Sequence, residues 1–217
     1  MLVLFQEHRQ QIVDAFKFLE ENGLNYGFSG NISVRLPREG LFLISPSGVR
    51  KSKLRPEDIL VVDENHKVLE GNGKPSVEAR THLAVYKARP DVGAIVHAHS
   101  PYSSVLAALR RSLPPILEET VIYLGGEILV ADYAVTGTEE LARNVVQALG
   151  YKNAVILANH GALACGQSLE EALDSLVYLE RAAKTYILAS LLGEPVKLPE
   201  EAYKIELEIF KSRRRPK

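Results

Sequence analysis

The chain has 217 residues, of which 46% are hydrophobic and 24% charged, enough to bury the core of one compact domain. We therefore expect a single domain over residues 1–217. The formal net charge of -1 creates no field that would attract nucleic acid or an anionic membrane, which favours a small anionic substrate. A lone cysteine, Cys165, excludes an intrachain disulfide framework, and no apolar stretch is long enough for a membrane span or a signal peptide. These features favour a cytoplasmic protein.

Two loops near the start of the chain have the composition of an anion site. A helix is expected over residues 4–22, and Gly23 ends it. Ser29-Gly30-Asn31 then precedes a short strand, and Ser45-Pro46-Ser47-Gly48 follows a strand over residues 41–44. Each loop offers hydroxyl or amide groups and backbone N–H groups at a strand end, which suits the oxygens of a phosphate. The alternative for each loop is a plain turn in which glycine adopts a positive φ.

The next segment delivers a carboxylate. Residues 59–69 predict a β-hairpin with a polar turn. Ser76 fits the N-cap of a helix over residues 77–88, which would place Glu78 in its first turn. The helix dipole alone can favour an acid there, but Glu78 can also be a catalytic carboxylate held by a rigid element. For His82, one turn later, we expect an orienting or packing role rather than ligation.

Three histidines lie at the ends of apolar strands. A run rich in β-branched residues predicts a buried strand over residues 92–99, and because side chains alternate along a strand, His97 and His99 project to the same side. Two imidazoles on one rigid face form half of a metal site. A second buried strand over residues 153–159 leads into His160, the third candidate imidazole.

The remaining pattern completes an α/β chain. It predicts a helix over 101–109, a loop at 114–115, a strand over 128–130, a helix from Thr138 to near Gly150, a long helix over 168–192 and a last helix over about 200–211. A flexible basic tail is expected from about residue 212. Together the elements predict a three-layer α/β/α sandwich around a central mixed, largely antiparallel sheet.

The candidate residues favour metal-assisted chemistry. Three neutral imidazoles with one oxygen ligand suit a divalent metal with an exchangeable position, and Zn²⁺ is the commonest ion in such sites. Cys165 has no ligand-like spacing to histidine, so a cysteine-rich structural zinc site is excluded. Glycine-rich motifs for dinucleotides or ATP are absent from the sequence. Its lysines fall in loops or on helices, which gives little support to a Schiff base.

Five segments, in this order, resemble the class II aldolase and adducin head family. They are Ser29-Gly30-Asn31, Ser45-Pro46-Ser47-Gly48, Pro75-Ser76-Val77-Glu78, His97-Ala98-His99-Ser100 and Asn159-His160-Gly161. The resemblance implies that His97, His99 and His160 hold Zn²⁺, with Glu78 as general acid/base and a possible fourth ligand. It also implies phosphate binding by Gly30, Asn31, Ser47, Gly48 and Ser76, and a homotetramer with sites at subunit boundaries. The implied reaction is retro-aldol cleavage of a ketose 1-phosphate, such as L-fuculose 1-phosphate, to dihydroxyacetone phosphate and an aldehyde.

Some positions depart from the family pattern and leave alternatives open. Val77 stands where a phosphate-loop serine is expected, Thr136 replaces an aromatic residue, and the tail tyrosine is lost. Tyr123 is a candidate for the tyrosine offered across a subunit boundary. L-ribulose-5-phosphate 4-epimerase shares the fold, but that branch has aspartate where Glu78 stands; methylthioribulose-1-phosphate dehydratase remains open. A non-catalytic adducin-like module would have no reason to keep three imidazoles and an acid.

Overall fold

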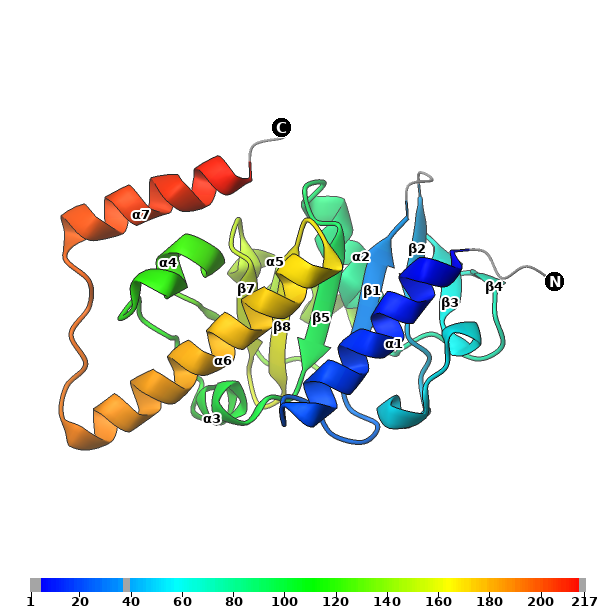
Figure 1. Ribbon diagram of the computed structural model, residues 1–217, viewed down its shortest axis with the longest axis horizontal. Helices are drawn as coiled ribbons and strands as arrows, with labels where there is room; N and C mark the ends of the chain where they lie inside the picture. The colour runs from blue at the N-terminus through cyan, green and yellow to red at the C-terminus, as the bar shows by residue number, and fades with distance from the viewer. Residues whose placement is uncertain (1–4, 37–39, 215–217) are drawn as a thin grey trace.

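The computed structural model describes residues 5–36 and 40–214, which form one eight-stranded sheet with helices on both faces (Figure 1). The strands are β1 (Asn31–Arg35), β2 (Leu41–Ile44), β3 (Leu60–Asp63), β4 (Val68–Glu70), β5 (Ala94–Ala98), β6 (Val130–Ala131), β7 (Ala154–Leu157) and β8 (Gly161–Gly166). The helices are α1 (Gln6–Glu21), α2 (Ala79–Ala88), α3 (Pro101–Leu109), α4 (Glu118–Leu124), α5 (Glu139–Leu149), α6 (Leu169–Leu192) and α7 (Glu200–Arg213), with short 3₁₀ turns η1 (Lys51–Lys53) and η2 (Pro56–Asp58).

The sheet has the strand order β4-β3-β2-β1-β5-β8-β7-β6. Neighbouring strands are antiparallel, except that β6 runs parallel to β7. Helices α1 and α6 cover one face, and α2 and α5 cover the other (Figure 1). The predicted α/β/α sandwich with a mixed, largely antiparallel sheet is therefore confirmed. Among the described residues, no helix is long and apolar enough to cross a membrane.

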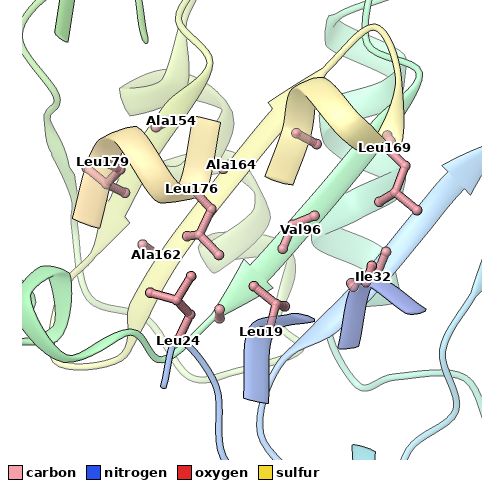
Figure 2. Close-up of a cluster of buried hydrophobic side chains, with 14 of the residues drawn as sticks. Leu19, Leu24, Ile32, Val96, Ala154, Ala162, Ala164, Leu169, Leu176 and Leu179 are labelled. Carbon is pink, nitrogen blue, oxygen red and sulfur yellow. The ribbon is translucent and has the colours of Figure 1, made fainter. Parts of the chain in front are cut away.

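The core on the α1/α6 face explains why the central strands carry so many small residues. Leu176 and Leu179 of α6 belong to the same buried cluster as Ala162 and Ala164 of β8 (Figure 2). Alanine side chains let a helix lie close to the sheet, and both faces of β8 are covered, so all six of its residues are buried. This packing holds in place the ends of the central strands β5 and β8, where the histidines lie.

Strand β8 and helix α4 were not predicted from the sequence. Strand β8 has no polar alternation, because helices cover both of its faces, so the pattern after the turn at residues 159–161 does not predict a further strand. Helix α4 follows the Pro114-Pro115 loop and is only seven residues long. Its Val121 and Leu124 are fully buried, so packing rather than helical length stabilises it.

The predicted start of the helix after Ser76 is wrong by two residues. A backbone bond from Ser76 N–H to the Ser45 carbonyl, and a bridge between Pro46 and Pro75, keep this segment extended. Helix α2 can begin only after the extended stretch, at Ala79. The structure therefore places Glu78 at the N-cap, with φ -93° and ψ 5°, and not in the first turn.

Residues 212–214, which were expected to begin a flexible basic tail, lie against the body of the protein. Helix α7 continues to Arg213, whose guanidinium lies over the ring of Tyr123, 4.7 Å from its centroid. Arg214 binds the side chain of Asp91 and the carbonyl of Tyr151. These contacts hold residues 212–214 on the body of the protein, and the remainder of the expected tail lies outside the described residues.

Candidate active site

Three imidazole rings meet at one edge of the sheet. His97 is in β5, His99 follows the end of that strand, and His160 lies in the turn between β7 and β8. The ring centroids are 4.8 to 5.1 Å apart, and the candidate ligand nitrogens all lie within 4.8 Å of one another. Antiparallel pairing of β5 with β8, and of β8 with β7, brings these distant residues of the chain together.

The donor set fits a divalent metal ion. The Nδ1 atom of His97 lies 2.9 Å from the Ala162 carbonyl, which can only accept a hydrogen bond, so Nδ1 carries the proton and Nε2 keeps a lone pair. That Nε2 is 3.2 Å from the Nε2 of His99. Burial lowers the pKa of His97 to about 4 and lowers that of His99, so both rings are neutral near pH 7. Neutral imidazoles that converge in this way are typical ligands of Zn²⁺.

Glu78 completes the cluster and is only 5% exposed. Its Oε2 lies 3.2 Å from His97 Nε2, and its Oε1 lies 3.8 Å from His160 Nε2. Asn31, which faces His97 in the pairing of β1 with β5, donates from Nδ2 to Glu78 Oε2 over 2.6 Å. Burial raises the pKa of Glu78, but the neighbouring imidazoles and the hydrogen bond from Asn31 outweigh it and keep the pKa below its usual value. The group is therefore an ionised carboxylate next to the three rings.

The turn that carries His160 depends on its two neighbours in the chain, Asn159 and Gly161. Asn159 has a left-handed backbone with φ 56°, and its N–H donates to the Ala107 carbonyl over 3.0 Å. Its Oδ1 accepts from Arg110 Nε over 3.0 Å. Asparagine tolerates this conformation better than most residues, which is the one sequence signal that could have found it.

Gly161 lets His160 approach the other two histidines closely. A Cβ at this position would lie 2.7 Å from the Ala98 carbonyl oxygen and 2.9 Å from Cδ2 of His99. Real Cβ atoms almost never make contacts this short, so only glycine fits without a shift of the backbone of β5.

The predicted phosphate residues lie on loops that hydrogen bonds join. Ser47 N–H donates to the Lys74 carbonyl, and Ser76 N–H donates to the Ser45 carbonyl. Ser47 and Gly48 are exposed, whereas Ser76 is buried and accepts a hydrogen bond on Oγ from Glu78 N–H over 3.3 Å. Gly30 and Gly48 both have positive φ, of 75° and 73°. The side-chain amide of Asn31, which was expected to bind phosphate, instead donates a hydrogen bond to Glu78.

His82 has the orienting or packing environment expected of it. It is fully buried, and its Nδ1 lies 2.7 Å from Ser33 Oγ. The same hydroxyl lies 2.8 Å from the Tyr86 hydroxyl. Burial lowers the pKa of His82 to about 3, which keeps the ring neutral behind Glu78.

Val77 and Thr136, which depart from the family pattern, lie on segments in contact, and Tyr123, the candidate for the tyrosine offered across a subunit boundary, lies on α4. Val77 is 62% exposed, and the backbone of Gly137, next to Thr136, approaches it: a Cβ on Gly137 would lie 3.0 Å from the Val77 carbonyl oxygen. Tyr123 instead stacks on Tyr178 of α6, with ring centroids 4.0 Å apart.

Fold and site together define an α/β/α protein in which three histidines that could hold a metal ion lie beside a carboxylate. The family model described as Class II Aldolase and Adducin N-terminal domain matches residues 10–187. The chain belongs to this family, as a class II aldolase.

Individual relatives match over almost the whole chain. The 5-methylthioribulose-1-phosphate/5-deoxyribulose-1-phosphate aldolase of Rhodospirillum rubrum is 39% identical over 204 residues, 94% of this chain and 91% of the relative. The L-fuculose phosphate aldolase of Escherichia coli K12 is 38% identical over 204 residues, 94% of each chain. A solved structure of an L-fuculose 1-phosphate aldolase superimposes with a TM-score of 0.89 at 41% identity, over 94% of this chain and 95% of that chain.

Proposed function

We propose that the protein is a zinc-dependent class II aldolase that cleaves a ketose 1-phosphate into dihydroxyacetone phosphate and an aldehyde. The observation that carries the proposal is the carboxylate of Glu78 held against three converging imidazoles. L-Fuculose 1-phosphate, which would give lactaldehyde, is the first substrate to test.

In this proposal His97, His99 and His160 hold Zn²⁺, and Glu78 is a further ligand when no substrate is bound. The ion supplies a Lewis acid for the negative charge that develops on the ketose oxygens when the carbon–carbon bond breaks. An internal lysine is then not needed as an electron sink. The Ala162 carbonyl and the Asn159 turn orient the rings of His97 and His160 for this purpose.

Glu78 moves the proton at C3, the carbon next to the ketone. In cleavage, the Glu78 carboxylate takes the proton of the C4 hydroxyl, the bond between C3 and C4 breaks to release the aldehyde, and Glu78 then gives that proton to C3 as dihydroxyacetone phosphate forms. A buried carboxylate with lowered pKa is a base at neutral pH and returns the proton after it has accepted it. The hydrogen bond from Asn31 fixes the Oε2 atom, so that the direction of proton transfer is set by the fold.

The substrate phosphate would be bound by neutral groups of the joined loops: the hydroxyls of Ser47 and Ser76 and the backbone of Gly30, Asn31 and Gly48. The exposure of Ser47 and Gly48 supports this assignment, because their donors are accessible to a ligand.

The relatives named above act on ketose 1-phosphates that differ beyond C4. Cleavage of 5-deoxyribulose 1-phosphate would give acetaldehyde, and 5-methylthioribulose 1-phosphate would give a methylthio aldehyde, with dihydroxyacetone phosphate common to all. Val77 and Thr136, which depart from the family pattern, lie on segments in contact beside Glu78. We therefore expect these segments to influence the choice of aldehyde rather than the reaction.

The test is incubation of the zinc-loaded protein with the three ketose 1-phosphates, and with L-ribulose 5-phosphate, followed by NMR analysis of the products. Dihydroxyacetone phosphate with the matching aldehyde is expected from at least one 1-phosphate. Epimerised pentose or a dehydrated ketone instead would identify the epimerase or the dehydratase reaction. Protein that purifies without zinc and converts none of the four would revive the non-catalytic module.

We also expect a homotetramer with sites at subunit boundaries. Exposed apolar side chains on the segments beside the candidate site support this expectation: Tyr26, Phe28, Val77, Tyr133 and Val135. Light scattering after gel filtration measures the mass directly, and a monomer at working concentration would contradict the expectation.

A further inference from the structure

Lys51, the first residue of η1, has a buried ammonium group. The residue is only 3% exposed. Its Nζ donates to the Pro46 carbonyl over 3.2 Å and lies over the ring of Phe16, 5.3 Å from the centroid. Within the described part of the chain, Lys51 forms no ion pair with a carboxylate.

The same residue connects the candidate phosphate loops. The backbone N–H of Lys51 donates to the Gly27 carbonyl over 2.7 Å, while its side chain binds Pro46. It thus joins the loop that leads to Gly30 with the loop that contains Ser47. Hydrogen bonds already tie the second loop to residues 74–76, so the positive charge is located where the three segments meet.

The fold alone does not account for a charge in this position. Burial lowers the pKa of Lys51 to about 8. Among the residues that the structure describes, no charged neighbour offsets this effect: Glu20, one turn after Phe16 on α1, forms no ion pair with Lys51, and Arg50 stacks over Phe28 instead. Burying an ammonium group without a counter-ion costs free energy. A charge that is retained at such a cost beside a candidate anion site is typical of functional groups.

We propose that Lys51 is a positioning residue of the substrate-phosphate site: its ammonium group supplies the positive charge that the neutral donors lack and fixes the loop that carries Ser47 and Gly48. The inference rests on the phosphate site of the proposed function. Lys51 acts through the Pro46 carbonyl and through its charge, and the phosphate itself contacts the exposed loop donors. Charge in a low-dielectric region acts over several ångströms, so direct contact is not required.

The main experiment compares Lys51→Met with Lys53→Met, a matched removal of an exposed lysine from the same turn. The dissociation constant for inorganic phosphate is measured by calorimetry on the zinc-loaded protein at pH 7, and KM and kcat are measured with the ketose 1-phosphate. Lys51→Met is expected to weaken phosphate binding and raise KM about tenfold, equal to about 1.4 kcal/mol, with little change in kcat or zinc content. Lys53→Met should match the wild type, and wild-type phosphate affinity in Lys51→Met would overturn the proposal.

The pH dependence separates the charge of Lys51 from a purely structural role. For this series the ligand is glycerol phosphate, a phosphate ester whose second ionisation, with a pKa of about 6, is largely complete at pH 7.5. Between pH 7.5 and 9 the wild type should therefore lose phosphate affinity as Lys51 deprotonates, while Lys51→Met should stay constant over that range. This wild-type titration is informative even if the variant does not fold. A wild-type affinity that is constant over the range would overturn the role of the charge.

The outcomes also distinguish this inference from the proposed function. If no ketose phosphate is cleaved but Lys51→Met still loses phosphate affinity, the reaction is wrong and the role of Lys51 holds. If cleavage occurs and Lys51→Met binds phosphate as the wild type does, only the role of Lys51 is wrong.

Discussion

Replacement of Glu78 by glutamine tests the proposed chemistry with little change in shape. The amide oxygen of glutamine can still accept the hydrogen bond from Asn31 Nδ2, and the side-chain volume is almost the same. The change removes the negative charge and the group that accepts a proton. The three imidazoles are unaltered, so Glu78→Gln is expected to retain zinc.

The magnitude follows from what is left in the site. Within the described residues, Glu78 is the only carboxylate within ion-pair distance of the three rings, so no neighbouring acid can take over its role. General acid–base catalysis contributes about 10² to 10⁴ in rate. We therefore expect kcat to fall by that factor, about 2.7 to 5.4 kcal/mol in activation free energy, with KM changed only a few-fold.

The decisive assay does not require the physiological aldehyde. Dihydroxyacetone phosphate is incubated with zinc-loaded protein in D₂O, and loss of the C3 proton signal is followed by NMR, because Glu78 should exchange this proton in the absence of an aldehyde. The control is Glu57→Gln, which alters an exposed carboxylate outside the candidate site and should exchange the C3 proton at the wild-type rate. Wild-type exchange by Glu78→Gln at full zinc content would refute the acid/base role.

Three further predictions concern the residues that hold the site. The pKa of Lys51 falls from its ordinary 10.5 to about 8 on folding, so between these pH values the unfolded chain binds more protons and the free energy of unfolding rises with pH. In urea denaturation, Lys51→Met should therefore be more stable than the wild type at pH 7.5, by a difference that shrinks towards pH 10.5. A difference that stays constant with pH would contradict this prediction. Asn159→Ala should weaken zinc binding about 10- to 100-fold in chelator competition, because alanine strains the left-handed turn before His160, whereas Asn159→Gly should lose less zinc affinity. Equal zinc affinity in the wild type and both variants would show that the turn does not position the ring. Glu180 accepts hydrogen bonds from the first N–H groups of α3, those of Tyr102 and Ser103, so Glu180→Gln should lower the free energy of unfolding by about 1–3 kcal/mol. Glu170→Gln, at an exposed position, is the control, and an equal loss of stability in the two variants would be evidence against this cap.

Much of the fold follows from patterns that are local in the chain. Thr138 and Ser168 were expected to begin helices, and each is an N-cap whose side-chain oxygen accepts a backbone hydrogen bond from the third residue after it. The alternation of His97 and His99 likewise needed only the geometry of a strand. In contrast, Glu78 was placed inside a helix, because the strand-like bonds of Ser76 to a distant loop cannot be recognised in the local pattern.

Residue type and spacing by themselves determined the α/β/α architecture, the pair of histidines on one face of a strand, and the set of residues able to bind a metal and move a proton. Only the tertiary structure decided which of them meet. The register of β1 with β5 places Asn31, the hydrogen-bond donor to Glu78, opposite His97, and the β7–β8 turn adds His160. The burial of Lys51 was decided in the same way. Periodicity along the chain depends on local backbone geometry, whereas these contacts depend on pairing between segments that the chain separates widely, and that pairing is fixed by the packing of the whole sheet.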